Sequence, residues 1–446
     1  VNAEYRPRWT TLFVSIAVFI GIVALADLFG ENPTKSIWSN FERMEGLVAL
    51  LHLFAYALVA GTTLASEKLW LWFWRVSLGV SVFVSLHTIL QSLTTDTVRL
   101  FSTLGNPIYL AVYALFHIFI ALLLSTRRGV TNAERPIYFF AIPFLFLAVY
   151  LTSARGATIG ILGGLLVSAL GIAFVKRGNR TILITALVSV ALLLSLVSGF
   201  LLIKEKPFVQ ENPLLQRFAS ISLTDQSIFT RTVIGRIAWE GIKEHPLLGW
   251  GQENFNLVFA KYYDSRIYAQ EQWFDRTHNI VSDWLIAAGL LGLLAYISIF
   301  LALLFTIYKT EDFSSVQKWL LVGLLSAYGF NNLTVFDDTI SYITFFSVVA
   351  WVYSVASDVR GGFKERSTPP KEISKQVART VGVPLVFLLV MLFAWSVNNA
   401  PFQAGRGLIS ALREVGTAQA LARQGLLTEA KARLDKSFEL FKQAEA

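Results

Sequence analysis

The sequence predicts an all-α fold: a polytopic bundle of transmembrane helices with a large extracytoplasmic loop and a C-terminal helical, tetratricopeptide-like tail. Three observations support this prediction. Of the 446 residues, 54% are apolar and only 15% are charged. The mean hydropathy is +0.56, and apolar runs long enough to cross a bilayer recur along the chain. This composition argues against a soluble enzyme.

Cysteine content and net charge narrow the possible chemistry. The chain has no cysteine, which excludes disulfides, thiolate catalysis and cysteine-ligated metals. Its formal charge of +8 does not by itself indicate nucleic-acid binding, because loop charges in membrane proteins first reflect topology. We expect no nucleic-acid partner and no cofactor.

Apolar runs predict about eleven membrane spans in this chain. Several are shorter than the roughly 20 residues that a bilayer core requires, so we expect these to be tilted or partly buried. The predicted spans are 10–29, 46–65, 69–91, 107–125, 136–152, 157–175, 181–202, 283–308, 318–336, 340–357 and 380–397. They define a transmembrane domain over 1–398, with its large loop at 203–282, followed by the start of the tail at 399–446.

The two ends of the sequence suggest that the natural chain is longer. It begins at Val1 in a polar segment, so we expect one further span upstream. From Gln403 to Ala446 it is charged and alanine-rich, with apolar residues at helical spacing around a turn at Gly425. Helix-turn-helix pairs of this kind resemble a tetratricopeptide unit, which needs neighbours to bury its apolar face. We therefore expect the chain to stop inside a longer repeat array.

Basic residues in alternate short loops predict the orientation. By the positive-inside rule, the richer set of loops is cytoplasmic, and the long loop and the C-terminus lie outside. The richer set contains Arg6, Arg8, Lys68, Arg127, Arg128, Arg135, Lys176, Arg177, Arg180, Lys309, Lys318 and a basic run from Arg360 to Arg379. The opposite short loops contain Lys35, Arg43, Arg99 and Arg155. Topology does not explain these outer arginines, whereas an anionic ligand would.

The long polar segment from Lys204 to Ser282 is expected to be an ordered active-site lid. It is too aromatic for disorder, and long loops within compact proteins are usually functional. Its notable residues are Arg217, Arg231, Arg236, Arg266, Arg276, His245, His278, Tyr262, Tyr263, Tyr268, Trp273 and Phe274. The aromatic residues suit sugar stacking and membrane-interface anchoring equally well.

The first candidate motif, Ser153-Ala154-Arg155-Gly156, lies at the predicted outer end of a span. A guanidinium group matches phosphate oxygens bidentately, which makes Arg155 a good phosphate ligand. The alternative is an arginine that reaches to the membrane interface while Gly160, Gly163 and Gly164 let helices pack closely.

The second motif runs from Arg231 to Gly251 and places Arg236 and Trp239 on a predicted helix. This helix should end before His245-Pro246, because the residue that precedes a proline avoids the helical region. The alternative is an amphipathic helix lying on the membrane surface with its basic residues at the headgroups.

The third motif is Thr277-His278-Asn279, followed by a span that begins at Asp283-Trp284. A histidine at the water end of a membrane helix can act as a general base. The alternative is a histidine that only forms structural hydrogen bonds, which is also how we interpret the isolated His52, His87 and His117. The sequence contains no HxxxH or HExxH spacing, so we expect no metal site.

Together these motifs resemble the O-antigen ligase superfamily. The resemblance rests on Ser153 to Gly156, on Arg236 and Trp239 followed by His-Pro-Leu-x-Gly-x-Gly, and on His278-Asn279 ahead of Asp-Trp-Leu and Gly-Leu-Leu-Gly. It spans roughly Glu31 to Trp351, and the segment Asn40 to Gly46 fits the family's outer Arg-Gly segment before a span. Each piece alone is weak, but the ordered combination is specific.

The resemblance implies a metal-independent, inverting glycosyltransferase of the GT-C type in the bacterial cytoplasmic (inner) membrane. Its donor would be a glycan on undecaprenyl diphosphate, used at the extracytoplasmic face. His278 would be the catalytic base and Arg155, Arg231 or Arg236 would bind diphosphate, with Arg43 and Arg276 as weaker candidates. The supporting residues would be Ser153, Asn279, Asp283 and Trp239, and either Asp275 or Asp283 would orient His278.

Several activities remain open within this resemblance. The protein would be a ligase, a repeat-unit polymerase or a protein O-oligosaccharyltransferase, with a glycan, a lipid or a protein as acceptor and membrane lipid around it. A repeat-like tail favours protein contacts slightly. A transporter of lipid-linked glycan is least favoured, because few charged residues lie within the spans and no internal symmetry is visible.

Overall fold

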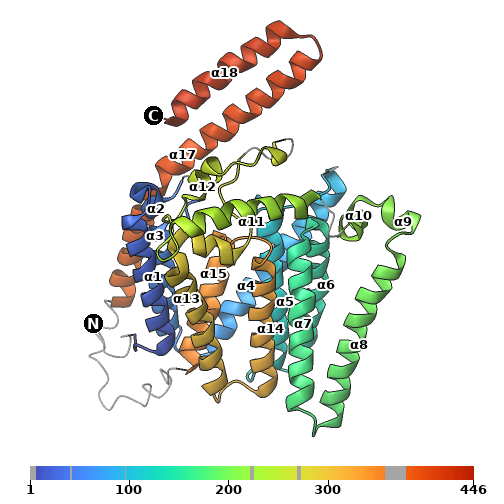
Figure 1. Cartoon of the computed structure of the whole chain (residues 1–446). Coiled ribbons are helices and arrows are strands. Elements are labelled where there is room, and N and C mark those ends of the chain that lie inside the picture. The colour runs from blue at the N-terminus through green and yellow to red at the C-terminus, as the bar shows by residue number, and fades with distance from the viewer. Residues whose placement is uncertain are drawn as a thin grey trace. The chain divides into compact units, whose positions relative to one another are not determined.

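The computed structural model describes residues 7–40, 43–95, 97–220, 226–268, 273–356 and 378–445. Within these ranges every regular element is helical, which confirms the predicted all-α class (Figure 1). The chain divides into two compact units, 1–363 and 364–446, and each is described by itself.

The first unit carries the helices of the bundle and those of the long polar segment. The bundle helices are α1 (Thr11–Phe29), α2 (Pro33–Trp38), α3 (Leu47–Thr63), α4 (Glu67–Thr94), α5 (Pro107–Thr126), α6 (Arg135–Thr152), α7 (Arg155–Val175), α8 (Arg180–Ile203), α13 (Ile280–Lys309), α14 (Ser315–Asn332) and α15 (Thr339–Ala356). The polar segment contains α9 (Pro207–Gln210), α10 (Pro213–Ala219), α11 (Gln226–Glu244), α12 (Phe255–Lys261) and the short 3₁₀ helix η2 (Ser265–Ile267).

All eleven predicted spans coincide with helices, but not all of these helices meet the requirements of a membrane span. Among the described residues, eight helices are long and apolar enough to cross a membrane. Helix α3 is shorter, with 17 residues, and α14 buries the polar residues Gln317, Asn331 and Asn332. The chain is therefore a multi-pass helical membrane protein, while the predicted number of spans stays a prediction.

Local sequence signals account for where the helices begin. Asn106 accepts a hydrogen bond from the backbone of Ile108 and is followed by Pro107 in the first turn of α5. Ser314 and Gln317 form a reciprocal capping box at the start of α14. Such caps satisfy backbone N–H groups that have no partner within the helix.

Glycines bring α7 and α14 into close contact. A Cβ atom added at Gly160 would lie 2.5 Å from the carbonyl oxygen of Ala327, and one added at Gly156 would overlap the hydroxyl of Thr334. The glycines after Arg155 thus act as small residues at a helix interface. This packing also places the start of α7 beside Thr334.

The polar segment folds into a small helical layer with a core of its own. Helix α11 lies across one end of the bundle (Figure 1). Its apolar side joins residues of α12, η2 and α13 in a buried cluster formed by Val233, Ile234, Ile237, Ala238, Trp250, Phe255, Val258, Phe259, Ile267, Phe274 and Ile286. The expectation of an ordered segment is confirmed for its described residues, and its function as a lid stays a prediction.

The second unit contains a π-helical turn (Ala378–Gly382), α17 (Val383–Arg423) and α18 (Leu427–Glu445). The predicted domain boundary at 398 falls inside α17, because the helix continues through the change in composition. Helices α17 and α18 form a hairpin closed by Gly425 at φ +81° and by ion pairs of Glu414 with Arg433 and Lys436, at 2.9 and 2.5 Å. The resemblance to a tetratricopeptide unit stays a prediction, and most of the basic run from Arg360 to Arg379 lies outside the described residues.

Candidate active site

Several loops and helix ends meet at one end of the first unit. The amide of Leu100 donates to the carbonyl of Leu151 at 3.2 Å, and the amide of Glu31 donates to the carbonyl of Trp250 at 3.1 Å. The side-chain amide of Asn279 donates to the carbonyl of Leu333 at 2.9 Å. These contacts gather the outer arginines and His278 at the same end of the bundle.

The loop after α11 is held by a break in α13. Helix α13 is interrupted at Ala288 and Gly289, which have non-helical backbone angles. The amides of Trp250 and Gly251 donate to the carbonyls of Ile286 and Ala287, and the amides of Leu290 and Leu291 donate to those of Pro246 and Leu247. The break therefore satisfies its backbone groups through the loop, as irregular backbone in a membrane protein requires.

This arrangement explains two of the sequence motifs structurally. Gly249 has φ +69°, and an added Cβ there would overlap the carbonyl of Ile286. Gly289 has φ +63° and lies against the backbone of Leu247. The His-Pro-Leu-x-Gly-x-Gly motif thus docks onto the Gly-Leu-Leu-Gly motif, because only glycine tolerates both the left-handed conformation and the close approach.

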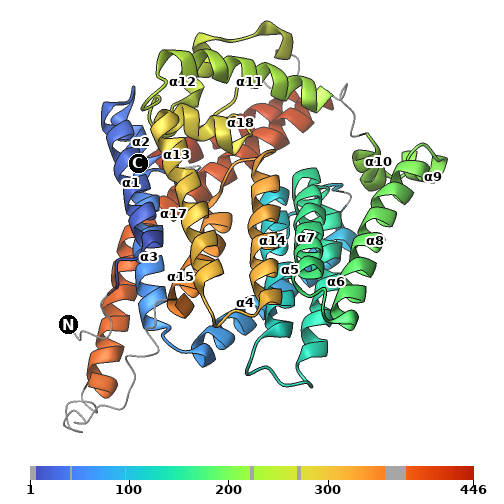
Figure 2. The ribbon, with the colours of Figure 1, turned by 60° about the horizontal axis from the view of Figure 1, so that its bottom comes forward.

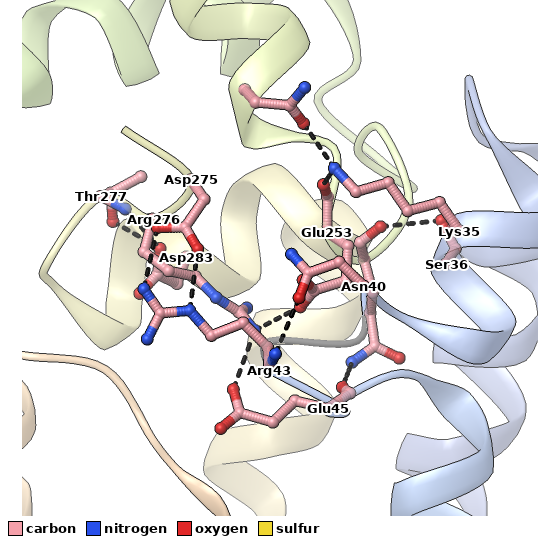
Figure 3. A network of polar contacts seen from close by, with 12 residues as sticks. Lys35, Ser36, Asn40, Arg43, Glu45, Glu253, Asp275, Arg276, Thr277 and Asp283 are labelled. Carbon is pink, nitrogen blue, oxygen red and sulfur yellow. Dashed lines mark hydrogen bonds and ion pairs between the residues drawn. The ribbon is translucent and has the colours of Figure 1, made fainter. Parts of the chain in front are cut away.

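The far side of the same loop is held by α1 and α2. The amide of Gln252 donates to Asp27 at 2.7 Å, and the hydroxyl of Ser36 donates to the carbonyl of Gln252 at 2.8 Å. The ammonium group of Lys35 donates to the carbonyl of Glu253 at 2.6 Å. The loop is thereby fixed on both sides, and Glu253 is directed toward Arg276 (Figure 3).

Two outer arginines belong to a buried ion network, which we define as Arg43, Arg276, Asp275, Glu45 and Glu253 (Figure 3). Arg43 donates to both oxygens of Asp275, at 2.8 and 3.1 Å. Arg276 pairs with Glu45 at 2.9 Å and also with Glu253. Burial opposes ionisation of Arg276 and Asp275, but the bonds from Arg43 lower the pKa of Asp275, and the two glutamates raise the pKa of Arg276.

Phe336 connects this network with His278. The guanidinium carbon of Arg43 lies 4.7 Å from the centre of the Phe336 ring, and that of Arg276 lies 5.8 Å from it. The ring centres of His278 and Phe336 are 5.2 Å apart. Phe274 contacts the imidazole edge to face, with the ring centres 5.7 Å apart.

His278 is held neutral at pH 7, although the same lowering of its pKa makes it a weaker proton acceptor than a free imidazole. Its backbone is left-handed, at φ +57°, and the next residue, Asn279, caps α13. Burial and then the charge of Arg231 lower the pKa of His278 to about 4. The imidazole is therefore neutral at pH 7, as a general base must be.

The predicted carboxylate partner of His278 has other contacts. Asp275 binds Arg43, and Asp283 accepts from both the amide and the hydroxyl of Thr277 at 2.8 Å. Among the described residues, no side chain hydrogen-bonds the imidazole. Neither Asp275 nor Asp283 hydrogen-bonds the ring in this structure, and the expectation that one of them orients it stays a prediction. Asp283 instead supports the loop that carries His278.

Arg99 and Arg155 form a second group of charges at the same end, which we call the arginine pair. Arg155 begins α7 and donates to the hydroxyl of Ser220 at 2.9 Å. The Nε atom of Arg99 is buried without a hydrogen-bond partner in the described part of the chain. Burial and then the charge of Arg155 lower the pKa of Arg99, and no carboxylate among the described residues pairs with Arg99.

Ser153 lies next to the arginine pair. It has φ +53° and ends α6, and its hydroxyl oxygen is buried without a hydrogen-bond partner in the described part of the chain. A buried hydroxyl without a partner carries an energetic cost unless a ligand or water supplies a bond. Its predicted supporting role remains a prediction.

The two arginines of α11 point in different directions. Five residues separate Arg231 from Arg236, which is roughly 140° around an α-helix. The charge of Arg231 acts on His278. Arg236 instead acts on Asp264, whose pKa is lowered to about 2, mainly by hydrogen bonds from Arg266. Arg231, Arg236 and Trp239 are all exposed, so what distinguishes Arg231 is that its charge acts on His278.

Glu45 and Glu253 were not among the site residues predicted from the sequence. They form the ion pairs that hold Arg276. Both lie in the segments that form the motifs, Glu45 just before Gly46 and Glu253 two residues after Gly251. The signal available in the sequence was a glutamate within two residues of a motif glycine. Arg99 was noticed only as a charge that topology left unexplained.

A metal site would need several ligating side chains close together. In those ranges, no group of three or more histidine, cysteine, aspartate and glutamate residues lies close enough to hold a metal ion. Independence from metals stays a prediction, and it depends on whether arginine charges perform the role that a metal ion would have.

A bundle of membrane-length helices with an arginine-rich polar site at one end defines a multi-pass membrane protein whose site suits an anionic ligand. Residues 139–297 match the family model described as O-Antigen ligase. No curated protein matched the chain. The family match confirms the resemblance to the O-antigen ligase superfamily and supports a glycosyltransferase of the ligase and polymerase type. The matched region includes Arg155, Arg231 and His278, whereas Arg43 and Arg99 lie outside it.

Proposed function

We propose that the protein is a metal-independent GT-C glycosyltransferase that moves a glycan from undecaprenyl diphosphate to an acceptor hydroxyl at the outer face of the cytoplasmic membrane. The observation that supports this proposal best is the neutral imidazole of His278 beside the charge of Arg231. The arginine pair lies at the same end of the bundle. Thr334 adjoins the start of α7, and Phe336, two residues later, contacts His278.

The reaction needs one proton acceptor and several fixed positive charges. The acceptor oxygen attacks the anomeric carbon, the bond from that carbon to the phosphate oxygen breaks, and undecaprenyl diphosphate leaves. His278 takes the proton of the acceptor hydroxyl. Guanidinium groups stabilise the charge that develops on the diphosphate, which is the contribution that a metal ion makes in other enzymes.

The contacts rank the predicted diphosphate ligands. We assign Arg155 and Arg231 to the diphosphate and add Arg99, which has no carboxylate partner among the described residues. Arg43 and Arg276 position the loops of the site, because each is already held by carboxylates. Arg236 is less suited, since its charge acts on Asp264 and not on His278, and Trp239 carries no charge.

The acceptor distinguishes the activities that share this chemistry. Transfer to a lipid core defines a ligase, transfer to a second lipid-linked glycan defines a polymerase, and transfer to a protein hydroxyl defines an O-oligosaccharyltransferase. The helical hairpin of α17 and α18 is a reason to include protein acceptors among the candidates.

The deciding experiment is glycan transfer by the reconstituted protein from a purified undecaprenyl-diphosphate donor, with a chelator present. Wild type should transfer, whereas His278→Ala and Arg155→Ala should lose about 10²-fold or more in rate. His245→Ala is the matched control, because His245 is an exposed histidine of the same polar segment. Equal rates for all variants, or a strict requirement for metal, would refute the proposal. Movement of intact donor across the bilayer without transfer would indicate a transporter.

A further inference from the structure

An apolar groove lies between α13 and α14, next to the candidate active site. The two helices run side by side in both views (Figure 1 and Figure 2). The groove has a volume of about 330 Å³, and its walls include Ile280, Leu293, Ile297, Gly329, Phe330 and Leu333. It is open along one side, since Phe330 and Leu333 are 40% and 48% exposed.

The polar side chains in the wall have partners within the protein. The hydroxyl of Ser326 donates to the carbonyl of Val322 at 2.9 Å. Tyr296 and Asn332 both donate to Asp337, at 3.1 and 2.7 Å. These polar groups need nothing from an occupant, so the groove suits a hydrocarbon and not a sugar or a phosphate.

The upper end of the groove coincides with the active site. The side chain of Asn279 bonds to the carbonyl of Leu333 and thereby joins the start of α13 to the end of α14. Ile280, the first residue of α13, lines the groove and lies two residues after His278. A molecule whose polar head lies at His278 can therefore place an attached hydrocarbon chain directly into the groove.

We propose that this groove holds the first isoprenoid units of the donor's lipid carrier. The inference rests on the proposed function, which places a polyprenyl diphosphate at His278. A groove that is open along the side of membrane-length helices admits such a chain from the bilayer without passage through water. Because bilayer lipid is as apolar as the groove, the contact adds little hydrophobic free energy and mainly aligns the diphosphate for reaction.

Gly329 provides a direct way to fill the groove. An added Cβ at this position meets no atom within 4 Å, and the same is true of Gly199 in α8. Gly329→Leu should therefore fold and should obstruct the groove, whereas Gly199→Leu is the matched control in a helix that does not line it. Both substitutions replace a helical glycine by leucine, so their effects on helix propensity are similar.

The first measurement is kcat/KM with two donors, one that carries the undecaprenyl chain and a short-chain donor that carries a methyl group in its place. Gly329→Leu should lower kcat/KM about tenfold for the long-chain donor and less than twofold for the short-chain donor. Gly199→Leu should change neither value. Equal losses with both donors, or no loss with either, would overturn the inference while leaving the proposed function intact.

The second measurement does not depend on activity. A polyprenyl diphosphate with a diazirine in its second isoprene unit should label peptides of α13 and α14, and undecaprenyl diphosphate should compete for this labelling. A diazirine-bearing phospholipid is the control. Labelling of α8 instead, or equal labelling by the phospholipid, would contradict the inference. If wild type transfers no glycan at all, the proposed function fails, and the labelling pattern still decides whether the groove takes isoprenoid chains.

Discussion

The ion network and the arginine pair use the same kind of side chain at the same end of the bundle in opposite ways. In the network, Arg276 lies between two glutamates whose side chains are 5% and 1% exposed. In the pair, the charge that acts on Arg99 is that of another arginine, Arg155, which lowers its pKa after burial does. A carboxylate partner turns an arginine into a structural element, whereas a second arginine leaves positive charge available for an anion.

Because of this difference, substitutions in the ion network should mainly change stability, and substitutions in the arginine pair should mainly change activity. Removing one member of the network leaves a buried carboxylate uncompensated, which is costly. Removing Arg99 relieves its repulsion with Arg155 and leaves no carboxylate among the described residues without its cation. Replacing an arginine by alanine should therefore lower the free energy of unfolding more in the ion network than in the arginine pair.

The largest effect is expected in the network. Arg276→Ala should lower the free energy of unfolding by ~3–5 kcal/mol, because Glu45 and Glu253 remain buried without their cation. Denaturant unfolding of the purified protein in detergent would measure this loss. A loss below ~1 kcal/mol would place Arg276 among exposed ion pairs and would remove the contrast between the two groups.

A double substitution tests whether an uncompensated buried carboxylate causes such a loss of stability. Arg43→Leu alone should destabilise the protein, since the largely buried Asp275 loses its partner. Arg43→Leu combined with Asp275→Leu should recover most of the loss, because removing both charges avoids the uncompensated one. Unfolding midpoints of the two single variants and the double variant would show whether the recovery occurs.

The next effect concerns the first member of the arginine pair. Arg155→Ala should lower glycan transfer by about 10²-fold, the usual cost of one donor to a developing negative charge. The fall of the unfolding midpoint should be smaller than for Arg276→Ala, which leaves two buried glutamates without their cation. A variant that loses stability and activity in parallel would assign Arg155 to the structural group.

A smaller loss is expected for Arg99, the second member of the pair. Arg99→Ala should reduce kcat/KM about tenfold, the equivalent of about 1.4 kcal/mol in transition-state free energy. Arg99→Lys should recover part of this activity, since the charge is kept but the bidentate geometry is lost. Full activity of Arg99→Ala would show that the unpaired guanidinium has no role in donor binding.

The smallest effect is a shift of the pH profile. The pKa of His278 is lowered to about 4, so the neutral base persists as the pH falls below 6.5 and is lost only near pH 4. The acid limb of kcat/KM, which reports the free enzyme, should lie near pH 4, and Arg231→Ala should move it to higher pH. Half-maximal kcat/KM near pH 6.5 in wild type would contradict the burial of His278.

The sequence by itself determined the all-helical membrane class, the location of the helices and the resemblance to the O-antigen ligase superfamily. Apolar runs, helix caps and glycine motifs are local signals, and a bilayer selects for them directly. For the same reason all eleven predicted spans coincide with helices, including α3 and α14, which are less typical spans. His278 could also be singled out, because its motif lies directly before α13.

Tertiary structure alone decided which arginine neutralises which carboxylate. Arg43 and Asp275 are 232 positions apart in the chain, and Arg276 and Glu45 are 231 apart. No periodicity or composition signal extends over such separations, because ion pairs depend on where helices and loops pack. The docking of the loop onto the break in α13 and the groove between α13 and α14 follow from the same packing. The sequence supplies the charges, and the fold determines which of them remain available for a ligand.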